Sequence, residues 1–131
     1  MRTPIVEHDG WQLVSAEERH RENPQSFEIP TEAQRGSLKA GDAAKLLFYI
    51  ETKSKGNVID RGIDRMWVIV KARSENGYEG ILDSDPGEAE NLRLRNGDTV
   101  LFRPEHIAAI EIPPRDYVIK KYGEDFFAED Q

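Results

Sequence analysis

The dipeptide Asn76-Gly77 is the strongest constraint that this sequence places on its fold. It lies between two runs rich in β-branched and aromatic residues, at positions 65–73 and 78–83. A type I′ turn needs positive φ at both central positions, which Asn and Gly tolerate, so the dipeptide predicts a β-hairpin. With a two-residue loop, Ala72 faces Ile81 across the hairpin.

The predicted hairpin has two different faces. One face is apolar and forms core; it carries Met66, Val68, Val70, Ala72 and Ile81. The opposite face mixes basic and aromatic residues and carries Arg65, Trp67, Ile69, Lys71, Arg73, Tyr78 and Leu82. We favour the interpretation that a helix covers this second face, with its charged ends exposed. If it is free, it suits a protein partner or single-stranded nucleic acid, with binding residues Arg65, Trp67, Lys71, Arg73 and Tyr78.

Other strands are predicted from similar runs. They are a short edge strand at 27–29 and longer strands at 43–53, 99–103 and 107–112. Flexible residues at 53–57 form a tip, the Asn-Gly-Asp triplet at 96–98 forms a turn, and 104–106 forms a corner. At this corner His106 is expected to cap a turn rather than act as a base. A sheet this small must protect its edges, so we expect it to curl.

Capping signals place the helices. Ser15 with Glu18 and Thr31 with Gln34 form capping boxes, which predict a helix at 16–22 and a short helix that Gly36 ends. Two prolines at 113–114 open a C-terminal helix that ends at Gly123.

The predicted fold class is α+β, with a small curled antiparallel sheet or SH3-like barrel of four to five strands and N- and C-terminal helices. We expect one domain over 1–131: a helical and loop region at 1–37, a β core at 38–112, and a helix with an acidic tail at 113–131. In that tail, Phe126 and Phe127 either dock on the core or form a partner motif.

Catalytic and metal-binding motifs are missing from the sequence. It has no cysteine, and its three histidines, His8, His20 and His106, have no metal-ligand spacing. No nucleophile elbow or phosphate-binding loop is present. The acids after Asp83 do not match a calcium loop, because positions five, six and twelve hold the wrong residues. We therefore predict no catalytic residues, no metal, no cofactor and a non-enzymatic role, with an enzyme of unfamiliar motif as an alternative.

The charge balance separates two binding hypotheses. The chain has 18 basic and 25 acidic residues, a net charge of −7, which argues against a nucleic-acid binder. Residues 39–73, however, carry eight basic and four acidic residues, so a small barrel that binds single strands through this segment and Trp67 is the alternative. Residues 75–90 carry six acids and no base: Glu75, Glu79, Asp83, Asp85, Glu88 and Glu90. An acidic surface of this kind speeds association with a basic protein, as in an immunity or antitoxin-like inhibitor.

Four short segments follow one another in the second half of the chain. They read Met-Trp-Val-Ile-Val at 66–70, Gly-Ile-Leu-Asp-Ser-Asp-Pro at 80–86, Gly-Asp-Thr-Val-Leu-Phe at 97–102 and Glu-His-Ile at 105–107. With the strand at 38–48, they resemble the bacterial family called domain of unknown function 2314, over about residues 27–112. The resemblance implies a small β-rich bacterial module and supplies no catalytic residues.

The sequence also bears on location and assembly. No stretch resembles a signal peptide, and no apolar run approaches the ~20 residues of a membrane-spanning helix. We therefore expect a cytoplasmic protein without membrane contact. Edges at 27–29 or 107–112 could pair with a second copy, and the oligomeric state is left open.

Overall fold

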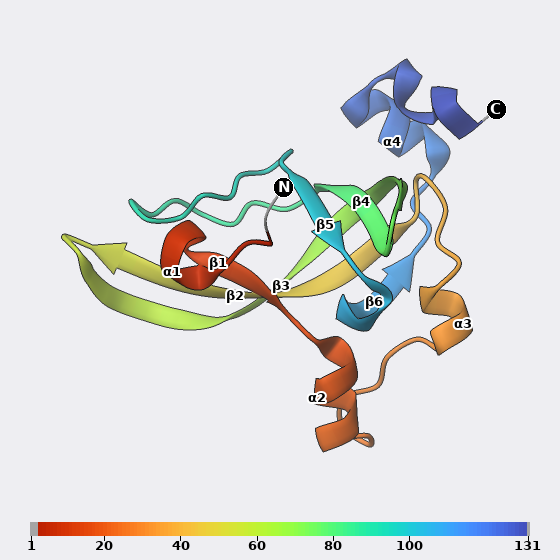
Figure 1. Ribbon diagram of the computed structural model, residues 1–131. Helices are drawn as coiled ribbons and strands as arrows, with labels where there is room; N and C mark the ends of the chain where they lie inside the picture. The colour runs from red at the N-terminus through yellow and green to blue at the C-terminus, as the bar shows by residue number, and fades with distance from the viewer. Residues whose placement is uncertain (1–2, 131) are drawn as a thin grey trace.

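A curled antiparallel sheet forms the centre of the protein (Figure 1). The structure, a computed structural model, describes residues 3–130, with side chains from 3 to 127. The sheet has six strands: β1 (Trp11–Val14), β2 (Ala43–Ser54), β3 (Asn57–Ser74), β4 (Gly77–Leu82), β5 (Thr99–Phe102) and β6 (Ile107–Glu111). Helices lie at both ends of the chain, so the predicted α+β class with a small curled sheet is confirmed.

Three of the four helices in the described residues, α2 (Ala16–Glu22), α3 (Glu32–Arg35) and α4 (Arg115–Tyr122), begin where the sequence predicted. The fourth is α1 (Val6–Asp9), and there are 3-10 turns η1 (Pro104–His106) and η2 (Glu124–Asp130). Ser15 Oγ accepts the Glu18 amide at 3.1 Å, and Thr31 and Gln34 form a complete capping box. In the described part of the chain, no helix has the length and apolar character needed to cross a membrane.

Long strand β2 organises the sheet. One of its edges pairs with β6 at residues 43–46 and with β1 at residues 47–50, and the other edge pairs with β3. The strand order across the sheet is β1-β2-β3-β4-β5, and β6 pairs with β2 alongside β1. Strand β1 and helix α1 were not predicted. The predicted strand at 27–29 was wrong, because these residues lie in an irregular segment between α2 and α3.

Two apolar clusters lie on opposite faces of the sheet. The main core covers one face, where the Phe48 ring packs at a tilt against Trp11 and the Phe102 ring against Tyr78, at ring-centre distances of 5.5 and 5.3 Å. The second cluster lies under α4 and η2 and consists of Ala43, Ile69, Val118, Phe126 and Phe127. The two tail phenylalanines are only 4% and 5% exposed, so they dock on the sheet.

The hairpin register differs from the predicted one. Ser74 pairs with Gly77, so the turn residues are Glu75 and Asn76, and Asn76-Gly77 is not a type I′ loop because neither residue has positive φ. An extra residue, Lys71, bulges from β3, and Ile69 therefore faces Ile81. This register has a packing reason. It turns Tyr78 and Leu82 into the main core, where both are fully buried, and moves Ile81 to the other face.

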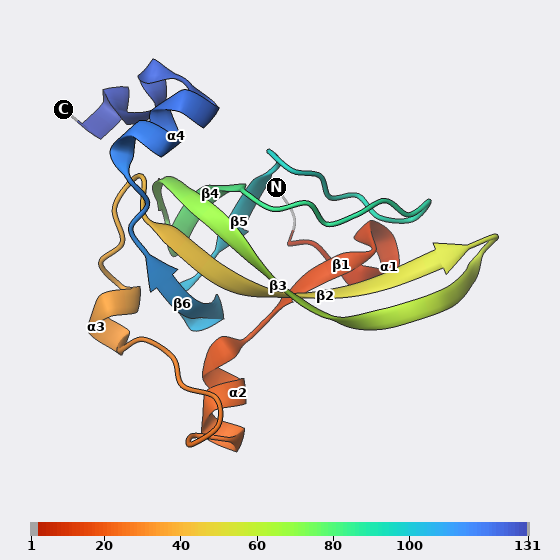
Figure 2. The ribbon, with the colours of Figure 1, turned by 180° about the vertical axis from the view of Figure 1, so that it is seen from behind.

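The hairpin of β2 and β3 extends well beyond the rest of the sheet (Figures 1 and 2). We call its outer part, residues 51–65, the arm. Its tip is a tight turn in which Lys55 and Gly56 have φ of 53° and 81°, as a type I′ turn requires. The tip was predicted, but the strand at 57–64 was not, because its charged residues break the apolar alternation.

Candidate functional site

The six acids at 75–90 do not form one surface. Glu75 lies in the β3–β4 turn, whereas Glu90 accepts the Gly56 amide at 3.1 Å at the opposite end of β3. β3 has 18 residues, so at about 3.3 Å per residue these two acids are about 60 Å apart along the strand. The predicted single acidic surface was therefore wrong.

Three of these acids do come together. Asp85, Glu88 and Glu90 line an open hollow of about 580 Å³ within the loop that follows β4. Asp85 is already engaged, since its carboxylate accepts the Gly87 amide at 2.9 Å. Glu79 lies apart from them, exposed on β4.

Asp83 points inward and binds α4. Its carboxylate accepts hydrogen bonds from the Tyr117 hydroxyl at 2.7 Å, the Lys121 ammonium and the Tyr122 hydroxyl. The Asp83 side chain is 9% exposed. We call Asp83, Tyr117, Lys121 and Tyr122 the α4 clamp. Placing Asp83 on a free binding surface was wrong, because its carboxylate is occupied.

The pKa shifts in the α4 clamp favour a structural role. Burial raises the pKa of Asp83, but hydrogen bonds from Lys121, Tyr122 and Tyr117 outweigh it and hold the pKa below its usual value. The hydrogen bond to Asp83 raises the pKa of Lys121, and burial followed by the Asp83 hydrogen bond raises that of Tyr122. Each pKa moves away from neutrality, whereas a general acid or base works best near the operating pH.

The basic and aromatic face of β3 is also largely occupied. Ile69 is 1% exposed beneath the second cluster, and half-buried Trp67 packs beside it with Lys45 Nζ 5.1 Å from its ring centre. Lys71 donates to the Phe126 carbonyl at 2.6 Å, and Arg73 donates to the Gly36 carbonyl at 2.6 Å. The favoured interpretation, a face covered by the C-terminal helices, is confirmed for Ile69. It was wrong for Leu82, which lies in the main core.

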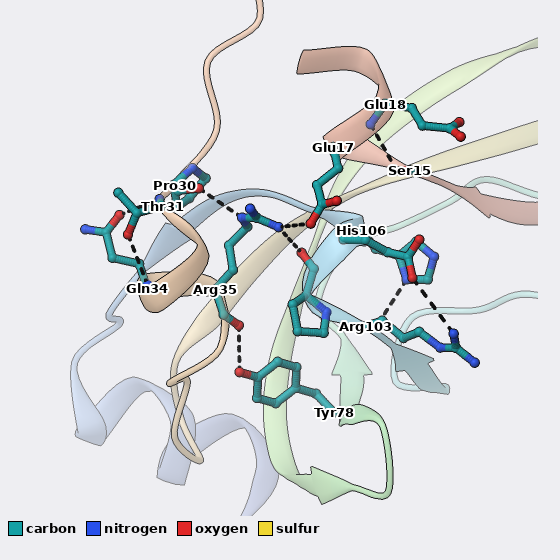
Figure 3. Close-up of polar contacts among 12 residues, drawn as sticks. Ser15, Glu17, Glu18, Pro30, Thr31, Gln34, Arg35, Tyr78, Arg103 and His106 are labelled. Carbon is teal, nitrogen blue, oxygen red and sulfur yellow. Dashed lines mark hydrogen bonds and ion pairs between the residues drawn. The ribbon is translucent and has the colours of Figure 1, made fainter. Parts of the chain in front are cut away.

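Tyr78 was placed on the wrong face. Its hydroxyl accepts the Leu38 amide at 3.2 Å and donates to the Arg35 carbonyl at 2.7 Å, inside the protein (Figure 3). Sequence analysis missed Arg35, whose side chain is 7% exposed. It donates to the Pro30 carbonyl at 2.9 Å, the Glu17 carboxylate at 2.7 Å and the Pro104 carbonyl at 3.2 Å. These contacts join the N-terminal segment to η1 and are structural.

His106 caps the corner, as expected. Its Nδ1 accepts the Arg103 amide at 2.9 Å, which leaves the ring proton on Nε2 (Figure 3). Burial lowers the pKa of His106 and outweighs the opposing effect of Glu105. The ring is therefore neutral at pH 7. Within the described residues, no group of three or more His, Asp or Glu side chains is placed to hold a metal ion.

The outer edge of β2 is covered along the arm. Beyond β1, the Glu51 amide donates to the Gly10 carbonyl at 3.0 Å. Asn91 then acts as a substitute strand, because its amide side chain binds the Lys53 amide at 2.8 Å and the Glu51 carbonyl at 2.5 Å. Contacts from Gly10 and from the loop after β4 thus protect this edge up to the tip.

The outer edge of β3 is uncovered along the arm. β4 pairs with β3 only from Val68 onward, and the last contacts at this edge are the Ser84 hydroxyl on the Trp67 amide and the Asp83 amide on the Trp67 carbonyl. No other strand pairs with residues 57–66 on this side among the described residues. In both views the outer part of this edge has no neighbouring strand (Figures 1 and 2). At its inner end the Arg65 guanidinium lies over the Phe27 ring, 5.5 Å from the ring centre.

Backbone direction identifies the free groups. In an antiparallel strand, alternate residues direct both backbone groups to the same side. Trp67 faces the β4 side, so Arg65, Ile63 and Arg61 face the uncovered edge as well. The Arg61 amide is covered only by its neighbour, since it donates to Asp60 Oδ1 at 2.9 Å. This bare edge, residues 60–65, is the candidate functional site, and sequence analysis did not identify it.

Fold and site together define an α+β protein with a projecting two-stranded arm whose β3 edge is bare. Comparisons with protein-family models, curated proteins and solved structures found no match to the chain. The resemblance noted from the sequence stays a prediction, and the function is argued from the geometry of the chain itself.

Proposed function

We propose that the protein is a non-enzymatic protein-binding module that captures an extended segment of another protein as an extra strand. The binding element is the bare edge of β3 in the arm. The observation that supports this is an asymmetry: loop and strand contacts cover the edge of β2 along the arm, while the edge of β3 is left open.

An open edge of this kind has a known physical consequence. Its unpaired amides and carbonyls form a template on which an extended peptide adds as a new strand, with main-chain hydrogen bonds supplying affinity. Proteins commonly place charges on such edges to prevent aggregation, and the arm does so with four charged residues between 60 and 65. The edge is therefore protected against indiscriminate pairing and still offers three outward-facing residues.

This proposal keeps the expected class of protein and moves the binding site from the acidic loop to the arm. Inhibition of the captured protein, as in immunity or antitoxin-like proteins, is one use of such binding. We propose the bacterial cytoplasm as the setting, as the resemblance and the absence of cysteine predict.

A displayed library of random peptides, selected on the full chain, tests the proposal. Binding is measured for the wild type, Ile63→Pro and Ile63→Ala. Proline at 63 removes one outward amide without touching the ladder to β2, and the preceding Gly62 tolerates a proline after it. The alanine variant keeps the amide and controls for loss of the side chain.

The expected result is that selected peptides bind the wild type and Ile63→Ala and lose at least tenfold in affinity on Ile63→Pro. Amide hydrogen exchange of the complexes should slow at residues 61, 63 and 65. Circular dichroism confirms that both variants fold. Peptides that bind Ile63→Pro equally well, or that protect other residues, would place binding elsewhere and overturn the proposal.

A further inference from the structure

The bare edge carries a regular charge pattern. Outward along β3, one sheet face presents Arg61, Ile63 and Arg65, and the other presents Asp60, Gly62 and Asp64. The arginines and Asp60 and Asp64 are all exposed, and the Arg65 guanidinium also contacts the Phe27 ring, 5.5 Å from its centre. One face of the edge is thus positive and the other negative, with a neutral residue in the middle of each.

This pattern disfavours a second copy as the partner. Two copies of β3 can pair antiparallel about a two-fold axis centred on any residue of the edge. An axis on a charged residue sets that residue against itself. With the axis on Gly62, Asp60 of one copy lies opposite Asp64 of the other. With the axis on Ile63, Arg61 of one copy lies opposite Arg65 of the other. Since like charges directly opposite destabilise a strand pair, every register is penalised.

We propose that the edge selects a partner strand with the complementary charge pattern. This inference rests on the proposed function and names its partner. In an antiparallel pair, directly opposite residues share a face. Read from its N-terminal end, opposite Arg65, the partner strand therefore carries acid, base, apolar, neutral, acid, base. All pairings in this sheet are antiparallel, which gives the direction.

The existing structure bears on three positions of this pairing. Glu51 already lies opposite Arg61 on β2, so an acidic residue of the partner would complete a row of acid, base and acid across three strands. The Arg61 amide donates a hydrogen bond to the Asp60 carboxylate. That bond must break before the amide can donate to a carbonyl of the partner strand. The apolar position of the partner falls opposite Ile63, which is half-buried against Tyr49.

Two synthetic hexapeptides of identical composition test the charge pattern. The matching peptide is Glu-Lys-Val-Thr-Glu-Lys, and the control is Glu-Glu-Val-Thr-Lys-Lys. In either strand direction the control makes two favourable and two unfavourable charge pairs, so it cannot match by reversing. Binding is measured by chemical-shift titration of the backbone amides of the full chain at low ionic strength.

We expect the matching peptide to bind about tenfold more tightly, with shifts at residues 60–65, and this preference to shrink as salt rises. The double variant Arg61→Glu with Arg65→Glu should remove the preference, because both peptides then make two favourable and two unfavourable pairs. Equal binding of the two peptides to the wild type, or a preference that persists in the double variant, overturns the charge rule.

The failure of this inference can be told from the failure of the proposed function. If library-selected peptides protect the edge but do not share the charge pattern, strand addition stands and the charge rule is wrong. If no selected peptide protects the edge, both are wrong. A concentration-dependent dimer in sedimentation that Ile63→Pro abolishes would show that a second copy occupies the edge, and would also overturn the charge rule.

Discussion

Replacing Asp83 by alanine should release α4 and η2 from the sheet while leaving the main core folded. The α4 clamp has one acceptor and three donors, and all three donors lie on α4. Tyr117 and Lys121 are 42% and 39% exposed, so water replaces their bonds and each contributes about 0.5 kcal/mol. The half-buried Tyr122 hydroxyl contributes about 1–2 kcal/mol.

The total of about 2–3 kcal/mol corresponds to roughly 30- to 150-fold faster amide exchange in α4, if α4 opens locally. Native-state hydrogen exchange measures this at residues 118–122, with Ile69 and Val70 in β3 as internal references. Tyr117→Phe is the matched control, because it removes one exposed donor and should accelerate exchange less than about fivefold. Unchanged exchange at 118–122 in Asp83→Ala would show that apolar docking alone holds the helix.

The same clamp predicts a dependence on pH. The pKa of Asp83 is lower in the folded protein than its ordinary value of 3.8. The unfolded chain therefore binds the proton first as pH falls, so the contribution is complete above about pH 3.8 and is lost below it, through the folded pKa. Urea unfolding between pH 5 and pH 2 should show this loss in the wild type and not in Asp83→Ala.

Three further predictions concern the structural contacts. Tyr78→Phe leaves two buried backbone groups without their partner and should lower the free energy of unfolding in urea by about 1–3 kcal/mol; a loss below 0.5 kcal/mol would contradict this. Burial lowers the pKa of His106 from 6.5, so the unfolded state binds the proton first and stability should fall as pH drops below about 6.5. His106→Gln should remove that part of the pH dependence, measured by urea unfolding from pH 7.5 to pH 5. Gly41 has φ of 93°, and an added Cβ would lie 2.7 Å from the Phe127 ring. Gly41→Ala should therefore cost about 2–3 kcal/mol and shift the Phe127 ring resonances, which would stay unchanged if the ring were free to move.

The elements that sequence analysis predicted correctly are those with local signals. The helix at 16–22 follows from one capping side chain, and the strand at 43–53 from an unbroken apolar run. The C-terminal helix follows from its flanking prolines and Gly123. Each signal lies within a few residues of the element that it defines, so no long-range contact was needed.

The errors come from contacts between distant segments. The Asn76-Gly77 signal located the hairpin, but the burial of Tyr78 and Leu82 decided the register by adding a bulge at Lys71. Asp83 could not be told from the exposed acids near it, because its partners lie 34 or more residues away on α4. Sequence distance hides such contacts.

The candidate site is hard to predict for a further reason. A strand edge can bind a partner only where no other segment of the chain pairs with it. Whether it is left unpaired depends on where every other element ends. Residues 57–64 also look unlike a strand, since their charges interrupt the apolar pattern. The charges that hide the strand from sequence analysis are those that keep its exposed edge from aggregating.

This dual role of the charges limits how the arm can change. Replacing Arg61 and Asp64 by valine would raise strand propensity and leave the main-chain template intact, yet remove the like-charge repulsion that penalises self-pairing. Such a variant should bind extended peptides with less selectivity and should self-associate, because its edge then accepts a second copy in several registers. Selectivity for a partner and resistance to aggregation are therefore two results of one charge pattern, and a substitution that weakens one is expected to weaken the other.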